Sequence, residues 1–197
     1  MSQRHKVFVS YHHANDQAYR DRFEQLFADI HDIMVPQSVQ IGDIDEYAAP
    51  ERIHQIIRDQ YLRDTRVTVV LIGAETWQRK HVDWEIGSSI RQTDYNPRSG
   101  LIGILLPTYQ PPAQDLLHTA AYRNTANNHC RKYYERTAPP RLVDNVKCGF
   151  AKIYEWSDDP VQVQQWIHKA FLSRTQLNPD NSFPGFIHNR SGSEWQR

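Results

Sequence analysis

The sequence has only two cysteines, no long apolar run and no excess charge of either sign. Cys130 and Cys148 are too few for a disulfide framework and lack the spacing of a metal site. Lysine plus arginine equals aspartate plus glutamate at 23 each, so no net field attracts nucleic acid or anionic lipid. No apolar stretch approaches the roughly 20 residues that a membrane span needs. We therefore expect neither nucleic acid nor a membrane as a partner.

Several familiar sequence motifs are also absent. The chain contains no G-x-G-x-x-G after its first strand pattern, no P-loop and no G-x-S-x-G. Its ten histidines form no H-x-x-x-H pair, so we expect no bound metal. The first residues, MSQRHK, lead directly into a strand pattern without the apolar core of a signal peptide. These features predict a globular cytoplasmic protein.

Strand-like and helical patterns alternate along the chain. Four apolar runs and a weaker fifth have the composition of buried parallel strands: residues 6–10, 67–72, 101–106, 150–156 and, more weakly, 38–41. Apolar residues recur at helical spacing after Asn15 as an N-cap, after Pro50 in a first turn, around Glu85, and after residues 157–160. This alternation predicts an α/β protein with a mostly parallel sheet that helices cover on both faces.

Two segments depart from this pattern. Residues 109–147 are rich in proline, asparagine, histidine, arginine and tyrosine, and they are too long for an ordinary connection. They form either a functional lid or partner surface, or a variable insertion without a role. Residues 174–197 are polar and contain several turn-forming residues, which predicts a loose C-terminal arm on a single domain of residues 1–173.

Two polar loops are candidates for ligand binding. Residues 10–16, SYHHAND, follow the first strand and adjoin a helix N-terminus, which suits an anionic group such as a pyrophosphate. The alternative is that Ser10, Asn15 and Asp16 only end a strand and cap a helix. The acidic loop 42–47 contains Asp45, which could reach ribose hydroxyls, although an exposed acidic turn is the commoner explanation.

The helix that carries Glu85 follows the buried strand 67–72. At 100° per residue, its buried stripe consists of Val82, Ile86, Ser89 and Ile90. Glu85 falls at the border of this stripe, on the same side as His81 and Ser88, while Trp84 points away from it. A border carboxylate can face the carboxyl ends of the strands, where open α/β sheets bind ligands. Plain solvation of Glu85 is the alternative.

Three segments together resemble a known family. They are KVFVSY at residues 6–11, VVLIG at 69–73 followed by Thr76 and Trp77, and VDWEI at 82–86. Residues 5–106 resemble the TIR-like family, and in particular the TIR-type proteins of Thoeris anti-phage defence. The resemblance implies a three-layer flavodoxin-like (TIR-like) fold.

The resemblance also implies roles for individual residues. In enzymatic members the helix glutamate is the catalytic residue of NAD cleavage, which maps onto Glu85. The loop after the first strand borders the nucleotide, which maps onto Ser10, Tyr11 and His12. Many members carry tryptophan four residues before the glutamate, where this chain has His81.

The implied activity breaks the nicotinamide–ribose bond of NAD, which is a substrate, with no metal or redox cofactor. Its product is an ADP-ribose-derived nucleotide, cyclic in our expectation, that activates a separate effector protein. The expected partners are NAD, a phage-derived trigger and further copies of the chain. Two other classes stay open: a non-catalytic TIR-like sensing or assembly module, and a nucleoside deoxyribosyltransferase-like enzyme, which also uses a glutamate on a related fold.

Overall fold

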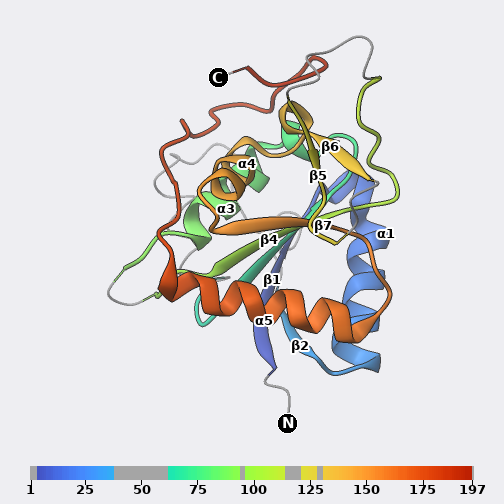
Figure 1. Ribbon diagram of the computed structural model, residues 1–197, viewed down its shortest axis with the longest axis vertical. Helices are drawn as coiled ribbons and strands as arrows, with labels where there is room; N and C mark the ends of the chain where they lie inside the picture. Colours follow the sequence, from blue (N-terminus) through green and yellow to red (C-terminus); the bar gives the residue numbers. More distant parts are fainter. Residues whose placement is uncertain (1–3, 38–61, 94–95, 114–120, 128–130, 197) are drawn as a thin grey trace.

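The computed structural model describes residues 4–37, 62–93, 96–113, 121–127 and 131–196, and its centre is a five-stranded parallel sheet (Figure 1). The strands lie in the order β2-β1-β3-β4-β7. Helices cover both faces of the sheet, so the predicted three-layer, flavodoxin-like α/β fold is confirmed. The strand bounds are His5–Ser10 for β1, Met34–Gln37 for β2, Val67–Ile72 for β3, Gly100–Leu105 for β4 and Ala151–Glu155 for β7.

The direction of strand addition reverses at β1. The chain places β2 on one side of β1 and then β3 on the other, so that Val7 pairs with both Pro36 and Val67. In a doubly wound sheet, the connections that follow strands on either side of such a reversal leave on opposite faces. The carboxyl ends of β1 and β3 are therefore the place where this architecture binds ligands.

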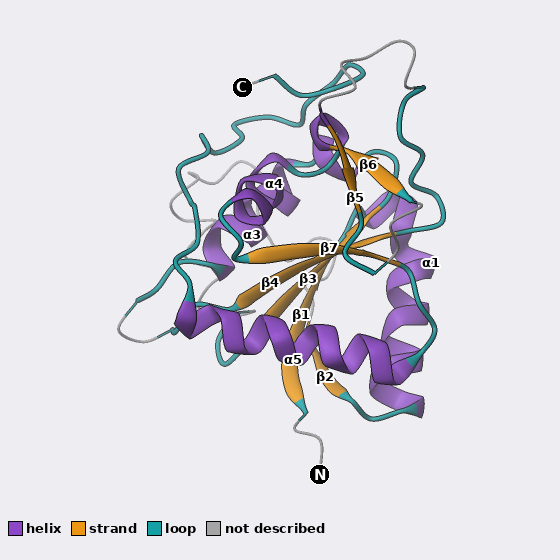
Figure 2. Cartoon of the chain, viewed as in Figure 1, coloured by secondary structure: helices purple, strands orange, loops and turns teal. Residues whose placement is uncertain are grey.

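A hydrophobic core lies on each face of the sheet. Because neighbouring strand residues point to opposite faces, Val69 and Leu71 of β3 enter the first core, and Val70 and Ile72 enter the second. Helices α1 and α5 cover the first core, and α3 and α4 cover the second (Figure 2). None of the helices in the described ranges is long and apolar enough to cross a membrane. The bounds are His13–Glu24 for α1, continued by a π-helical turn at Gln25–Ile30, Lys80–Ser89 for α3, Pro140–Lys147 for α4 and Pro160–Gln176 for α5.

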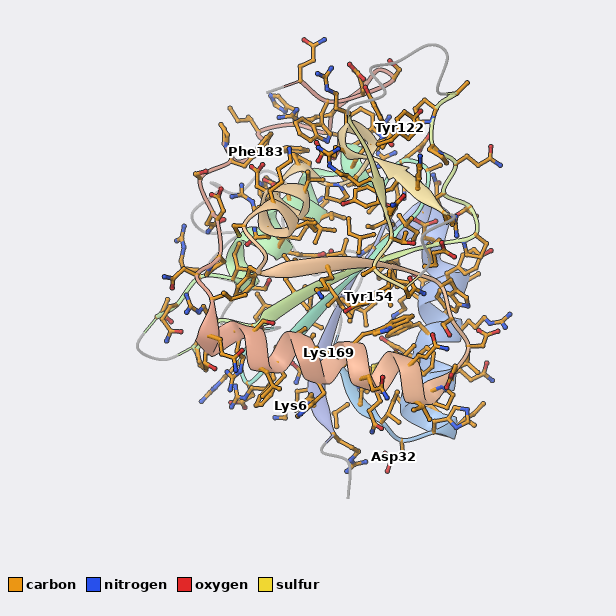
Figure 3. All side chains as sticks on the ribbon, viewed as in Figure 1. Lys6, Asp32, Tyr122, Tyr154, Lys169 and Phe183 are labelled. Atoms are coloured by element: carbon orange, nitrogen blue, oxygen red, sulfur yellow. The ribbon has the colours of Figure 1, made fainter. Side chains whose placement is uncertain are left out.

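Helix α5 packs closely on the sheet along its length. Tyr154 of β7, labelled in Figure 3, stacks on Trp166 of α5 with 4.4 Å between the ring centroids. At the other end, a β-carbon at Gly100 would lie 2.0 Å from the carbonyl oxygen of Ala170. Only glycine allows the start of β4 to approach the helix backbone this closely.

Helix α1 begins elsewhere than the sequence predicts, and the structure contains a strand, β2, that the sequence analysis does not predict. The N-cap of α1 is His12, whose Nδ1 accepts a hydrogen bond from the backbone N–H of Asn15 at 3.2 Å. The prediction of Asn15 as the cap was wrong because a histidine nitrogen can also accept this bond. The second strand, β2, ends at Gln37, whereas the strand expected at 38–41 and the helix expected near Pro50 fall outside the described residues.

The irregular segment at 109–147 ends in a helix that belongs to the core of the domain. The segment contains a short antiparallel hairpin, a 3-10 turn and α4. Leu142 and Val143 of α4 are buried in the second core. The expected insertion therefore includes a helix that covers the sheet. Helical spacing did not reveal α4 in the sequence, because the helix is only eight residues long. The hairpin strands are β5 (Tyr122–Asn124) and β6 (Lys132–Tyr134), and the turn is Glu135–Thr137.

The C-terminal segment is held against the domain, in contrast to the loose arm that the sequence predicts. It runs from the end of α5 past α3 and α4 (Figure 1). Three of its aromatic residues, Phe183, Phe186 and Trp195, are buried in the second core. Widely spaced anchors of this kind follow neither a helical nor a strand period, so pattern analysis missed them.

Candidate active site

Helix α3 is buried on all sides rather than along one stripe. Residues 82–89 all lie in the interior, because the C-terminal segment covers the side that faces away from the sheet. Trp84 lies on that side, and its Nε1 donates a hydrogen bond to the carbonyl oxygen of Phe186 at 2.8 Å. The tryptophan is therefore covered by the C-terminal segment, and it is not exposed to a partner.

Glu85 of α3 lies beside the end of β1. The residue is 2% exposed, so Glu85 is more deeply buried than the expected position at the border of the apolar stripe. Its Oε2 accepts a hydrogen bond from Oγ of Ser10, the last residue of β1, at 2.5 Å. A carboxyl group from the helix after β3 thus meets a hydroxyl group from β1 at the reversal point of the sheet. The structure brings these two predicted site residues together.

The environment of Glu85 favours its protonated form. Burial raises the pKa of Glu85 to about 8, and the hydrogen bond from Ser10 offsets only part of this rise. Desolvation without a neighbouring cation penalises the charged carboxylate. A buried carboxyl group with a pKa so far from its ordinary value, placed at the ligand-binding edge of a sheet, is typical of a functional site.

The substitution Glu85→Gln should stabilise the fold in a pH-dependent way. The carboxyl group ionises near pH 4.5 in the unfolded chain but near pH 8 in the folded protein. Between these values folding must take up a proton, which costs the wild type about 1.4 kcal/mol per pH unit. Relative to wild type, the free energy of unfolding of the variant should therefore rise by about 4 kcal/mol between pH 5 and pH 8. Urea unfolding at both pH values measures this difference, and a difference that stays constant would contradict the prediction.

Tyr11 follows β1 and lies within electrostatic reach of Glu85. Its ring stacks on His13 with 4.4 Å between centroids, and its hydroxyl donates to Gln17 Oε1 at 2.7 Å. Burial raises the pKa of the Tyr11 phenol, Arg20 opposes this rise, and Glu85 adds to it. The loop after β1 therefore presents an aromatic stack near the carboxyl group.

His12 has one ring nitrogen in a fixed role and one without a partner. Because Nδ1 accepts the hydrogen bond from Asn15, a neutral ring carries its proton on Nε2. Nε2 is buried and has no hydrogen-bond partner within the described residues; Glu75 Oε2 lies 3.8 Å away. A buried donor of this kind needs an acceptor, which supports the prediction that His12 contacts a ligand.

His13 is a further site residue, which the sequence analysis passed over. Burial lowers the pKa of His13, and the nearby His81 lowers it further. His81, in the first turn of α3, also contacts the Trp84 ring edge-on with 5.3 Å between centroids. His13 thus lies within electrostatic reach of α3, and its place in the polar loop 10–16 was the signal for it. Ser88, one turn beyond Glu85, is 5% exposed.

A second buried carboxyl group lies at the same edge of the sheet. Asp16, in the first turn of α1, accepts a hydrogen bond from Thr76 Oγ1 at 3.2 Å. A β-carbon at Gly73, directly after β3, would lie 2.4 Å from Asp16 Oδ1, so glycine makes room for this carboxyl group. Burial raises the pKa of Asp16, and the Thr76 hydrogen bond opposes that rise. The sequence indicates only a capping role for Asp16, because its partner Thr76 lies 60 residues away in the chain.

The described site combines carboxyl, hydroxyl, imidazole and phenol groups. Asp45 lies outside the described residues, so its contact with ribose stays a prediction. Among the residues that the structure describes, no group of three or more histidine, cysteine, aspartate or glutamate side chains could hold a metal ion. The side chains present can orient hydroxyl groups, stabilise positive charge and exclude water.

One family of known proteins matches the chain. The model of the family described as Thoeris protein ThsB, TIR-like domain, matches residues 8–111, which is slightly more than half of the chain. The match runs from within β1 to beyond β4, and it includes both Ser10 and Glu85. No curated protein matches the chain. The chain therefore belongs to the family of the TIR-like domain of Thoeris protein ThsB, and it is a defence-related TIR-like protein.

Proposed function

We propose that the chain breaks the nicotinamide–ribose bond of NAD, with Glu85 as the catalytic residue. The proposal is carried by one observation: a fully buried carboxyl group held by the Ser10 hydroxyl at the carboxyl end of β1. The family match supports it, because the matched residues include Glu85. In enzymatic members of the TIR-like family, which the chain resembles, the glutamate of this helix is the catalytic residue of NAD cleavage. NAD is the substrate in this proposal, and no metal or redox cofactor takes part.

The chemistry requires little more than a well-placed negative charge. The leaving nicotinamide is a cationic pyridinium, so no general acid has to protonate it. The transition state has oxocarbenium character at the anomeric carbon, as in glycoside hydrolysis. A carboxylate beside that carbon orients the ribose hydroxyls and stabilises the developing positive charge.

The raised pKa of Glu85 couples its ionisation to substrate binding. In the free protein, burial keeps the proton on the carboxyl group at neutral pH. The positive charge of the pyridinium favours the carboxylate and lowers the pKa when NAD enters. The catalytic charge therefore forms when the substrate arrives, and the free protein does not have to bury an unpaired carboxylate.

The loop after β1 and the first turn of α3 supply the remaining contacts. The Nε2–H of His12 donates to an oxygen of the substrate, because it has no other partner in the described structure. Tyr11 and its stacking partner His13 line the side of the carboxyl group and limit the access of water. In the same proposal, His81 and Ser88 contact the substrate from α3, and Asp45 reaches a ribose hydroxyl.

The acceptor of the ribosyl cation decides the product. Water would give ADP-ribose, whereas attack from within the molecule gives a cyclic ADP-ribose isomer. The deep burial of Glu85 supports the second route, because it restricts water near the reacting carbon. The cyclic product would act as a diffusible signal that activates a separate effector. A phage-derived trigger and assembly of several copies in the cytoplasm would switch the reaction on.

Product analysis in infected cells tests the proposal. Cells that carry the protein should lose NAD after infection and accumulate nicotinamide with a cyclic ADP-ribose isomer in equal amounts, as mass spectrometry measures. Uninfected cells serve as the control, because the trigger is missing there. Protection from phage without any loss of NAD would favour the non-catalytic sensing or assembly module. Transfer of deoxyribose between bases in place of NAD loss would favour the deoxyribosyltransferase.

A further inference from the structure

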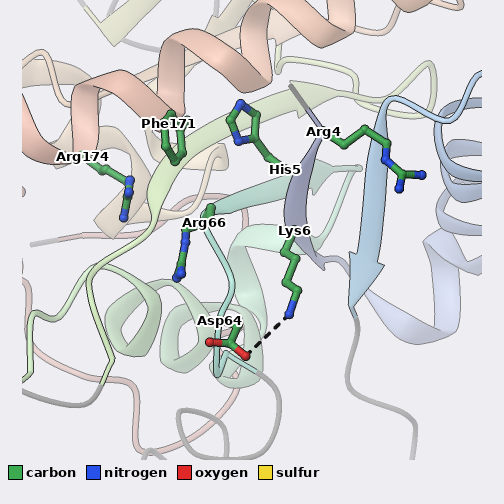
Figure 4. Close-up of a pocket in the computed structure, with 7 residues that line it drawn as sticks. All are labelled: Arg4, His5, Lys6, Asp64, Arg66, Phe171 and Arg174. Carbon is green, nitrogen blue, oxygen red and sulfur yellow. Dashed lines mark ion pairs between the residues drawn. The ribbon is translucent and has the colours of Figure 1, made fainter. Parts of the chain in front are cut away.

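A basic cavity lies at the amino-terminal edge of the sheet, opposite the candidate active site. It has a volume of about 390 Å³, and it is formed by the start of β1, the turn before β3 and the last turns of α5 (Figure 4). Lys6 lies near the start of β1 and Ser10 at its end, so the two sites are about 13 Å apart along the strand. The lining residues are Arg4, His5, Lys6, Asp64, Arg66, Phe171 and Arg174.

The charge of this cavity is unlike that of the whole chain. Lysine plus arginine balances aspartate plus glutamate in the sequence, yet four of the lining residues are lysine or arginine and one is acidic. A neighbouring cavity of about 350 Å³ shares Arg66 and Arg174 and adds Arg98. The two cavities are therefore adjacent at one edge of the sheet, and together we call them the basic groove.

Two guanidinium groups in the groove each have a nitrogen without a hydrogen-bond partner in the described structure. Arg66 Nη1 and Arg174 Nε are buried, and neither has a hydrogen-bond partner within the described residues. Burial lowers the pKa of Arg174, and the nearby charge of Arg66 lowers it further, so the two cations repel each other. Figure 4 shows both guanidinium groups pointing into the same space. An anion between the two guanidinium groups would accept hydrogen bonds from them and remove the repulsion.

The other cations of the groove already have partners within the protein, so they are not available as the main ligands of an anion. Arg4 pairs with Asp32 on the far side of β1, and Lys6 lies 3.5 Å from Asp64 in a largely exposed pair. Arg98 Nε donates to the carbonyl oxygen of Arg174 at 2.6 Å, which offsets the negative end of α5. Arg66 and Arg174 are therefore the groups left to bind a ligand.

The aromatic residue in the cavity has no free face for a nucleobase. His5 stacks on Phe171 with 4.2 Å between centroids, and Arg174 lies over the Phe171 ring at 4.4 Å. This arrangement holds the Arg174 guanidinium in place and leaves the ring unable to stack on a ligand. The recognisable part of the ligand is thus an anionic group that can accept several hydrogen bonds from arginine.

We propose that this groove is a binding site for a phosphate-bearing small molecule, with Arg66 and Arg174 as its direct ligands. A phosphate group has the charge and the several acceptor oxygens that two converging guanidinium groups require. Lys6 and Asp64 also line the cavity but pair with each other, so the two arginines supply the charge that attracts the anion. The site does not depend on the proposed NAD reaction, because it uses none of the residues around Glu85.

Calorimetric titration of the full chain with inorganic phosphate, pyrophosphate and a nucleoside triphosphate tests the proposal at constant ionic strength. We expect binding that strengthens with the number of phosphate groups and weakens at least tenfold in the Arg66→Gln/Arg174→Gln variant. Inorganic triphosphate, titrated beside the nucleoside triphosphate, distinguishes the two sources: equal affinities assign the site to the phosphate groups alone, and tighter binding of the nucleoside triphosphate assigns it to a nucleotide. Arg22→Gln is the matched control, because Arg22 forms an exposed ion pair with Asp158 on the surface of α1 and should leave the affinity unchanged.

Other results would overturn the proposal. They are no binding of any phosphate compound, equal affinity in wild type and the double variant, or binding of a polyglutamate peptide alone, which would indicate an acidic protein partner. Circular dichroism checks that the double variant is folded. The Arg66→Lys/Arg174→Lys variant keeps both charges, and we expect it to bind more tightly than the glutamine variant; if it does not, the assigned charges are not the ligands.

Discussion

Replacing Glu85 with glutamine should lower the rate of nicotinamide release from NAD at least about 100-fold, because the amide cannot stabilise positive charge at the anomeric carbon. The substitution preserves the size of the side chain and an oxygen that can accept the Ser10 hydrogen bond. The loss should therefore appear mainly in kcat, with a smaller change in KM. Nicotinamide release by the triggered wild type and variant, followed by mass spectrometry, measures the effect.

The pH dependence adds a second, independent sign of the same carboxyl group. The pKa of Glu85 is raised to about 8 in the free protein, so the carboxylate that the reaction needs is scarce below that pH. For wild type, kcat/KM should rise about tenfold per pH unit up to pH 8 and then level off. The kcat profile should level off at lower pH, because the cationic substrate favours the carboxylate.

A matched control separates loss of the catalytic charge from loss of any glutamate. Glu24 lies at the end of α1 and pairs with Arg20 at 3.0 Å, away from the carboxyl ends of the strands. Glu24→Gln should therefore retain the wild-type rate. Equal rates for wild type and Glu85→Gln in triggered samples would show that Glu85 is not the catalytic residue.

Replacing Arg141 with leucine should destabilise the fold by about 3–5 kcal/mol, because it leaves the Asp83 carboxylate buried without its cation. Arg141 Nε and Nη2 donate to the two oxygens of Asp83 at 2.9 and 3.2 Å, and both side chains are almost fully buried. Arg141 Nη1 also donates to Asn181 Oδ1 at 2.6 Å. This network joins α3, α4 and the C-terminal segment. Urea unfolding at pH 7 measures the loss, and proteolysis should cut the segment near Asn181 sooner in the variant.

A half-exposed arginine offers the control for this stability effect. Arg136 Nη1 pairs with Glu194 at 2.8 Å, but its side chain is 38% exposed. Solvent screens such a pair, so Arg136→Leu should cost no more than about 1 kcal/mol. Similar losses in the two variants would mean that burial of the Asp83–Arg141 pair does not determine its contribution.

The sequence predicts those parts of the fold whose signals are local. The continuous apolar runs of β3 and β4 indicate strands buried on both faces, and Asp159 followed by Pro160 marks the start of α5. Helix α4 was missed because eight residues give too few turns for a clear period. The aromatic anchors after residue 180 were missed because their partners lie far away in the sequence.

The sequence predicts where in the sheet the site lies, but not how deeply its side chains are buried. Glu85 follows a buried strand on a helix, which is enough to place it at the ligand-binding edge of the sheet. Its burial depends on packing beside Ser10 of β1, 75 residues away in the sequence, which no local pattern reports. His13 and Asp16 were missed for a related reason, because His81 and Thr76 reveal their roles only when the chain is folded.

The distant partners of α3 also bear on how the protein forms during synthesis. The ribosome adds Asn181 and Phe186 about a hundred residues after α3, the helix that they contact. Until these residues emerge, Trp84 and the Asp83–Arg141 pair lack part of their cover, and the helix that carries Glu85 is not yet fully enclosed. Nascent chains should therefore expose apolar surface and stay sensitive to proteases until residues 181–186 have emerged, so the proposed NAD-cleaving site would not be complete before these residues pack on α3.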